Sequence, residues 1–130
     1  MKKLSLEGLK FEATELDIKN NIMTITLNRP EKKNAINNVM MNEINYALAY
    51  AKQERNVRVV VIAAKGDIFC AGADLSRAES SSNVPKIENA DDISLAMRHL
   101  YKPVICKIQG SVLAGAPVSY THLRAHETSE

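Results

Sequence analysis

The segment Arg58–Ser76 (RVVVIAAKGDIFCAGADLS) combines a strongly apolar, β-branched run with a stretch of small residues. Val59 to Ala64 has the length and composition of one strand that is buried on both faces. A glycine-containing turn follows, and in Cys70–Asp74 no bulky side chain keeps a ligand away from the backbone. Asp74 and Ser76 are suited to the first turn of a helix. A strand that leads through such a turn into a helix presents backbone N–H groups to an electron-rich ligand atom.

The residues before this segment predict a hairpin. Leu9 to Glu15 alternates apolar and polar side chains, which indicates a half-buried strand, and Ile22 to Leu27 alternates again. Asn20-Asn21 is a turn signal between the two strands. Pro30 ends the second strand, because proline lacks the N–H that the strand ladder needs.

Helical periodicity appears on both sides of the central strand. Asn37 is the predicted N-cap of a helix that runs to about Glu54. Asp91 or Asp92 opens a second helix that continues to Leu100, and Val104 to Ile108 reads as another buried strand. The apolar stripe of the first helix comprises Ile36, Val39, Met40, Ile44, Ala47, Leu48 and Ala51. Hairpin, helix, strand, helix and strand together predict an α/β fold in which the helix packs on the sheet.

Composition excludes several function classes. The net charge is +2, and no basic stripe with interleaved aromatic residues occurs, which argues against a nucleic-acid partner. No apolar run approaches the ~20 residues that cross a bilayer, so we expect no membrane partner and a cytoplasmic protein. Cys70 and Cys106 lie in apolar contexts and are expected to be buried, reduced thiols.

A second small-residue turn, Gly110 to Ala116, follows the strand that ends near Ile108. Its glycines have the spacing of a phosphate-binding loop, but Ala116-Pro117 stand where that loop needs Lys and Ser/Thr. The sequence from Pro117 to Glu130 then drops the apolar pattern. His122 and His126 have helical metal-ligand spacing but no accompanying third ligand, so no metal site is predicted. This segment resembles translated sequencing-adapter read-through, and we expect residues 1–116 to be the folded part and residues 117–130 a non-native tail.

Three blocks in this order, ITLNRPEKKNAI, FCAGADL and KPVICKIQG, resemble the crotonase family of enoyl-CoA hydratases and isomerases. The resemblance runs from about Leu9 to Gly115. It implies the N-terminal part of the crotonase-like ββα superhelix, left incomplete because family members are considerably longer. It also implies an enzyme of fatty acid and acyl-CoA metabolism, a lyase or isomerase. CoA belongs to the substrate, so no cofactor is expected, and the whole protein is expected to be a homotrimer or a dimer of trimers.

The resemblance also assigns site residues. The backbone N–H groups of Ala73 and Gly115 form the oxyanion hole, which stabilises the enolate of the thioester. The carbonyl groups of Ala71 and Ala73 hold the adenine, while Asp74, Leu75 and Ser76 continue from Ala73 along the thioester end. Lys32 and Lys33 face the CoA phosphates as point charges. From the residues alone, Glu31–Asn34 reads equally well as a solvated connecting loop.

The sequence departs from the hydratase pattern at the position of the general acid/base. Hydratases carry a glutamate three residues after the second oxyanion glycine, and this chain has Val118 there. Hydration needs a proton donor and acceptor, so we expect this chain itself to be inactive. Two alternatives stay open: a CoA-thioester-binding module without catalysis, and a structural α/β domain whose AGAD turn only starts a helix.

Overall fold

The computed structural model describes residues 3–74, 81–87, 92–108 and 111–112. In chain order the elements are β1 (Thr14–Lys19), β2 (Ile22–Leu27), the 3-10 helix η1 (Pro30–Lys32), α1 (Asn38–Gln53), β3 (Val59–Ala64), β4 (Ile68–Cys70), α2 (Ile93–Arg98), β5 (Val104–Cys106) and β6 (Ser111–Val112). The expected boundary at residue 116 and the tail at 117–130 lie outside these residues. Within the described part of the chain, no helix has the length and hydropathy needed to cross a bilayer.

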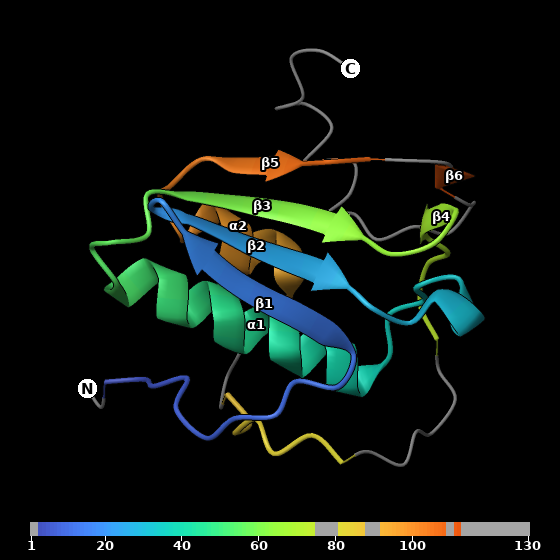
Figure 1. Cartoon of the computed structure of the whole chain (residues 1–130), viewed down its shortest axis with the longest axis horizontal. Coiled ribbons are helices and arrows are strands. Elements are labelled where there is room, and N and C mark those ends of the chain that lie inside the picture. The colour runs from blue at the N-terminus through green and yellow to red at the C-terminus, as the bar shows by residue number, and fades with distance from the viewer. Residues whose placement is uncertain (1–2, 75–80, 88–91, 109–110, 113–130) are drawn as a thin grey trace.

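Four strands form one sheet in the order β1-β2-β3-β5, and β4 pairs with β6 in a second, two-stranded sheet (Figure 1). β1 runs antiparallel to β2, whereas β2, β3 and β5 are mutually parallel. Each parallel step crosses over through a helix, α1 after β2 and α2 after β3. Because β2 and β3 end at the same edge of the sheet, η1 and β4 meet there, on the right of Figure 1. This edge carries the candidate site.

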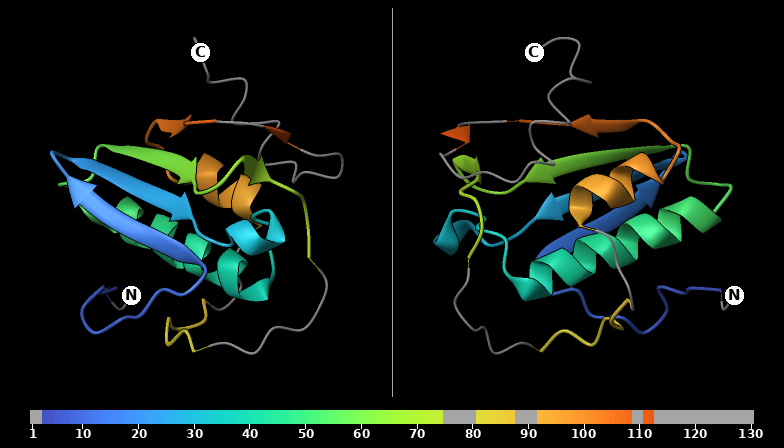
Figure 2. Two further views of the ribbon diagram at one scale, coloured as in Figure 1. Left: turned by 45° about the vertical axis from the view of Figure 1, so that its right-hand side comes forward. Right: turned by 180° about the vertical axis from the view of Figure 1, so that it is seen from behind.

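Both helices lie on one face of the four-stranded sheet (Figure 2). The core therefore forms on that face, where every second side chain of β2 and β3 is buried: Met23, Ile25, Leu27, Val60, Ile62 and Ala64. The α1 stripe predicted from the sequence packs against it, with Met40 and Ala47 fully buried. The prediction that β3 and β5 are buried on both faces is wrong. The alternate residues of β3 are only half-buried and Ile105 of β5 is 47% exposed, because the described helices cover one face alone.

The predicted hairpin is confirmed, but its first strand begins later than expected. Asn20 and Asn21 have φ values of 53° and 68°, so both central residues of the turn are left-handed, as tight hairpins require. β1 starts at Thr14, and Leu9–Ala13 forms no ladder. The N–H groups of Glu12 and Ala13 donate instead to the carboxylate of Glu43, at 2.7 and 2.9 Å. A long-range side chain thus takes the donors that a strand would have used.

Both helix starts are confirmed. The Asn37 side chain accepts a hydrogen bond from Met40 N–H at 2.9 Å, and Asp92, rather than Asp91, accepts one from Leu95 N–H at 2.9 Å. α2 ends at Arg98, two residues before the predicted Leu100. At the far end of α1, the Lys102 ammonium donates to three backbone carbonyls, those of Ala51, Glu54 and Val57. A cation at the carboxyl end of a helix is favourable because the last carbonyls carry partial negative charge.

Candidate functional site

The turn after β4 is joined to the chain segment that leads into α1. Gly72 has a φ of 103°, a conformation that only glycine adopts readily. Ile36 N–H donates to the Gly72 carbonyl at 2.8 Å, and Asp74 N–H donates to the Ile36 carbonyl at 2.8 Å. These two bonds make a single parallel bridge between Ile36 and Ala73. The bridge fixes the backbone on both sides of Ala73.

This bridge determines where the backbone groups of Ala73 point. In a parallel ladder, a residue whose two neighbours bond to the partner strand directs its own N–H and C=O to the opposite side. Ala73 N–H therefore points away from Ile36, and none of the residues that the structure describes accepts a hydrogen bond from it. Ala73 is exposed, whereas Gly72 before it is buried. The Ala73 N–H is thus held in a fixed direction on the side of the turn away from Ile36.

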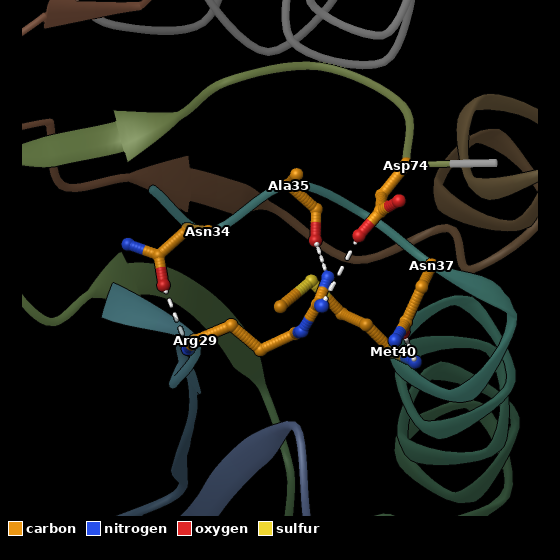
Figure 3. Close-up of polar contacts among 6 residues, drawn as sticks. All are labelled: Arg29, Asn34, Ala35, Asn37, Met40 and Asp74. Atoms are coloured by element: carbon orange, nitrogen blue, oxygen red, sulfur yellow. Dashed lines mark hydrogen bonds and ion pairs between the residues drawn. The ribbon is translucent and has the colours of Figure 1, made fainter. Parts of the chain in front are cut away.

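An ion pair lies directly beside the bridge (Figure 3). Arg29 Nη2 and Asp74 Oδ2 are 3.1 Å apart, and the two side chains are only 12% and 16% exposed. The other terminal nitrogen of the same guanidinium, Nη1, donates to the backbone carbonyl of Ala35. This contact was not predicted from the sequence, which indicated no role for Arg29 and placed Asp74 in the first turn of a helix or, by the resemblance, along the thioester end. The segment that Asp74 was expected to cap begins at residue 75 and lies outside the described residues.

Asn34 fastens η1 to the turn between β3 and β4. It is completely buried and accepts a hydrogen bond from Arg29 N–H at 2.8 Å. Its amide nitrogen donates to the carbonyls of Lys65 and Ile68 at 2.7 and 2.8 Å. The sequence indicated a charged surface loop here, and no local pattern identified the contacts of Asn34, because two of its three partners are more than 30 residues away in the sequence.

A cavity of about 200 Å³ opens at this junction, lined by Pro30, Lys33, Lys65, Asp67 and Ile68. The cavity contains two lysines and one carboxylate, that of Asp67, so its lining carries a small positive charge that favours an anionic group. Lys65 also pairs with Glu15 in an exposed ion pair. Lys32, the other predicted phosphate contact, is exposed on η1 and does not line this cavity.

The remaining predicted site residues divide into two groups. Ala71 lies half-buried in the turn beside Gly72, so it shares the segment with Ala73 and Asp74. Leu75, Ser76 and Gly115 lie outside the described residues, as do His122 and His126. Among the residues described, no cluster of three or more His, Cys, Asp or Glu side chains is arranged to hold a metal ion.

Cys70, three residues before Ala73, is expected to be inert. It is 2% exposed, and burial raises the pKa of its thiol, while a hydrogen bond from Gly72 N–H acts in the opposite direction. Cys106 is also a buried free thiol. We predict that neither thiol reacts rapidly with a disulfide reagent in the native chain at neutral pH, and that both react once urea unfolds it. A fast-reacting thiol in the native protein that Cys70→Ser removes would contradict this.

A family model described as enoyl-CoA hydratase/isomerase matches residues 17–118 of the chain. Trans-2-decenoyl-[acyl-carrier-protein] isomerase of Streptococcus mutans is 33% identical over 115 residues, which cover 83% of this chain and 44% of that protein. A probable enoyl-CoA hydratase of Mycobacterium bovis is 36% identical over 107 residues, which cover 72% of this chain and 36% of that protein.

The chain is also similar in fold to solved structures of this family. A probable enoyl-CoA hydratase of Mycobacterium thermoresistibile superposes with a TM-score of 0.63 and 34% sequence identity, covering 79% of this chain and 44% of that one. The chain therefore spans less than half the length of these relatives. The described elements thus form part of the crotonase fold.

Proposed function

Because the chain belongs to the enoyl-CoA hydratase/isomerase family and has part of its crotonase fold, we propose that it binds acyl-CoA thioesters at the turn after β4. The observation that carries the proposal is the oriented Ala73 N–H. It lies exposed at a turn whose flanking bonds to Ile36 are both made. An N–H held in this way is suited to donate to the carbonyl oxygen of a thioester.

The second donor of this proposal is the N–H of Gly115, the residue that the resemblance to the family assigns to this role; it lies outside the described residues. β4 and β6 are paired in parallel, with Cys70 opposite Val112 and a register shift between Ile68 and Cys70. We propose that both N–H groups donate to one thioester oxygen.

The chemistry follows from where charge develops. Removing a proton next to a thioester, or adding a nucleophile across its conjugated double bond, places negative charge on the carbonyl oxygen. Donors that are already aimed at this oxygen stabilise the charge without reorganising, which is worth about 3 kcal/mol per donor. Backbone N–H groups serve this purpose better than flexible side chains because the bridge to Ile36 fixes Ala73. No metal or cofactor takes part in this proposal.

In our proposal, this chain supplies no side chain for proton transfer to or from the substrate. Val118 stands where the family's hydratases have a glutamate. Without a positioned acid or base, catalysis lacks a factor of about 10²–10⁴. We therefore propose that the 130-residue chain binds acyl-CoA without appreciable turnover. The whole protein is proposed to act as a cytoplasmic homotrimer or dimer of trimers, and a binding module without catalysis is the second candidate.

The cavity beside η1 is proposed to hold the phosphates of CoA. Lys33 and Lys65 line it, and Lys32 stands on the adjoining η1 surface. The Streptococcus mutans relative acts, by its name, on a substrate carried by a protein rather than by CoA. The thioester chemistry is the same for both carriers, so the cationic cavity is the feature that favours CoA here.

The test is a titration of the chain with crotonyl-CoA and with the corresponding pantetheine thioester, followed by amide chemical shifts. We expect saturable binding that shifts the Ala73 and Lys33 amides, and no hydration above the buffer rate. Lys33→Ala and Lys65→Ala should each weaken CoA binding several-fold and leave pantetheine binding unchanged, because CoA carries phosphate groups and pantetheine carries none.

Lys19→Ala is the matched control, since Lys19 is exposed at the end of β1 that is remote from the cavity. If crotonyl-CoA binding does not saturate, or if its shifts fall away from Ala73, the proposed function is wrong. Equal losses in the Lys19 and Lys33 variants would refute the phosphate assignment alone.

A further inference from the structure

We infer that Arg29 and Asp74 form a positioning pair that fixes the direction of the Ala73 N–H. This inference rests on the proposed function for its catalytic meaning, but its geometric content can be tested without a substrate. Arg29 would act through the backbone and would not touch the thioester. It is therefore a positioning residue and not a catalytic one.

The contacts of the guanidinium carry the inference. Arg29 lies beyond the end of β2, while Ala73 and Asp74 follow β4, so the pair joins two segments that are far apart in the sequence. One arm of the guanidinium binds the carbonyl of Ala35, and the other binds the Asp74 carboxylate (Figure 3). Ala35 directly precedes Ile36, and Asp74 directly follows Ala73. A single planar group thus holds both strands of the Ile36–Ala73 bridge.

A lone bridge of two hydrogen bonds needs such support. A regular ladder fixes each strand through many successive hydrogen bonds, whereas the Ile36–Ala73 bridge is isolated and belongs to none of the strands β1–β6. It can therefore twist about its own axis unless another contact resists the motion. The guanidinium presents its donors in a rigid fork, so binding Ala35 and Asp74 together resists this twist. A lysine ammonium has no such planar geometry.

The Arg29 backbone is itself anchored. Its N–H donates to the buried Asn34 side chain at 2.8 Å, and the N–H of Asn28 donates to the Ala13 carbonyl at 2.9 Å. The side chain consequently extends from a fixed point. Both partners of the ion pair are largely buried, so water and salt screen their attraction weakly. By contrast, the Lys65–Glu15 pair is about half exposed and is expected to contribute little.

Precision at this donor matters for the proposed chemistry. An oxyanion donor acts through its distance and direction to the developing charge, and a misplacement of about 1 Å costs on the order of 10²-fold in rate. A pair that only stabilised the fold would change all properties of the chain together. Loss of a positioning pair is expected to increase the motion of Ala73 and the exchange of the bridge amides more than it affects the other strands.

The experiment compares Arg29→Met, Arg29→Lys and Asp74→Asn with the control Glu15→Gln, which breaks the exposed ion pair. The first measurement is the backbone ¹⁵N order parameter of Ala73, together with hydrogen exchange of the Ile36 and Asp74 amides. In Arg29→Met we expect the Ala73 order parameter to fall from about 0.85 to below about 0.6. Exchange of the two bridge amides should accelerate at least tenfold more than exchange in β2 and β3. Arg29→Lys should recover part of this loss, and Glu15→Gln should show none.

The second measurement uses a chromophoric cinnamoyl-CoA, whose absorption shifts to longer wavelength when donors polarise its carbonyl. We expect Arg29→Met to reduce this shift while the affinity for the CoA part stays within about twofold. If Arg29→Met does not fold, Asp74→Asn replaces it in both measurements. This variant removes the charge of the ion pair but keeps one acceptor oxygen, so we expect changes in the same direction and of smaller size.

Unchanged order at Ala73 and unchanged bridge exchange in a folded Arg29 variant would overturn the inference. Uniform acceleration of exchange across the sheet would also overturn it, because that result indicates general destabilisation. If the wild-type chain binds no thioester, the proposed function fails, whereas the order and exchange measurements still decide the positioning role.

Discussion

Asn34→Ala is expected to lower the free energy of unfolding of the chain by about 3 kcal/mol or more. The alanine leaves three backbone groups without their partner, namely the N–H of Arg29 and the carbonyls of Lys65 and Ile68. The three bonds are partly buried, and a polar group that loses its partner away from water costs about 1–3 kcal/mol. Asn34 also has a φ of 55°, where alanine is less favourable than asparagine. Urea denaturation with linear extrapolation measures the change.

Asn21→Ala is the matched control for this prediction. Asn21 is also left-handed, with a φ of 68°, but it is exposed and its side chain makes one hydrogen bond, to the Asn56 carbonyl at 2.7 Å. The conformational effect of alanine is therefore similar in both variants, and the difference isolates the buried hydrogen bonds. We expect Asn34→Ala to be more destabilising than Asn21→Ala by at least about 2 kcal/mol. Equal losses in the two variants would show that Asn34 does not hold the turn.

Asn34 also positions residues of the proposed binding site. Its three bonds hold η1 against the turn at residues 65–68, and the cavity between them is lined by Lys33 and Lys65. Gly66 permits this close approach, because a Cβ at that position would lie 3.1 Å from the Pro30 side chain. The same asparagine also fixes the Arg29 backbone. One buried amide thus supports both the cationic cavity and the ion pair beside Ala73.

Local patterns predicted the elements whose determinants are local. Asn37 and Asp92 were identifiable as caps because their partners are three residues away, at Met40 and Leu95. The stripe on α1 was readable because helical spacing reports one buried face. The alternation in Leu9–Ala13 misled, since the Glu43 carboxylate, distant in sequence, takes the N–H groups that a strand would have paired.

The second sheet and the site were harder to predict for the same reason. β4 has three residues and β6 has two, which is too short for a period to appear. The family resemblance supplied Ala73 as a candidate donor, but the bridge to Ile36 that orients its N–H joins segments that no local pattern connects. The pairing of Arg29 with Asp74 depends on the same contact between distant segments. Arg29 and Asn34 therefore became interpretable only from the assembled fold.

Ala73→Pro is expected to reduce the polarisation of a bound thioester strongly, because it removes one of the two proposed donors. Proline removes the N–H of Ala73 and nothing else from the bridge, because both bridging bonds use Ile36, Gly72 and Asp74. The absorption shift of cinnamoyl-CoA on binding should therefore decrease clearly, although the CoA part still binds and the second proposed donor remains. In a protein extended to the length of the relatives, loss of one donor should lower kcat by about 10²–10³-fold.

Ala73→Gly is the matched control for this replacement, since it changes the side chain at the same position and keeps the N–H. We expect it to retain most of the absorption shift. The amide resonances of Ile36 and Asp74 report whether the bridge survives in the proline variant, and an ester bond in place of the amide at residue 73 removes the donor without a ring if proline disturbs the turn. A proline variant with an intact bridge and an undiminished absorption shift would exclude Ala73 from the site, because its N–H is the group of this turn that is proposed to bind the thioester oxygen.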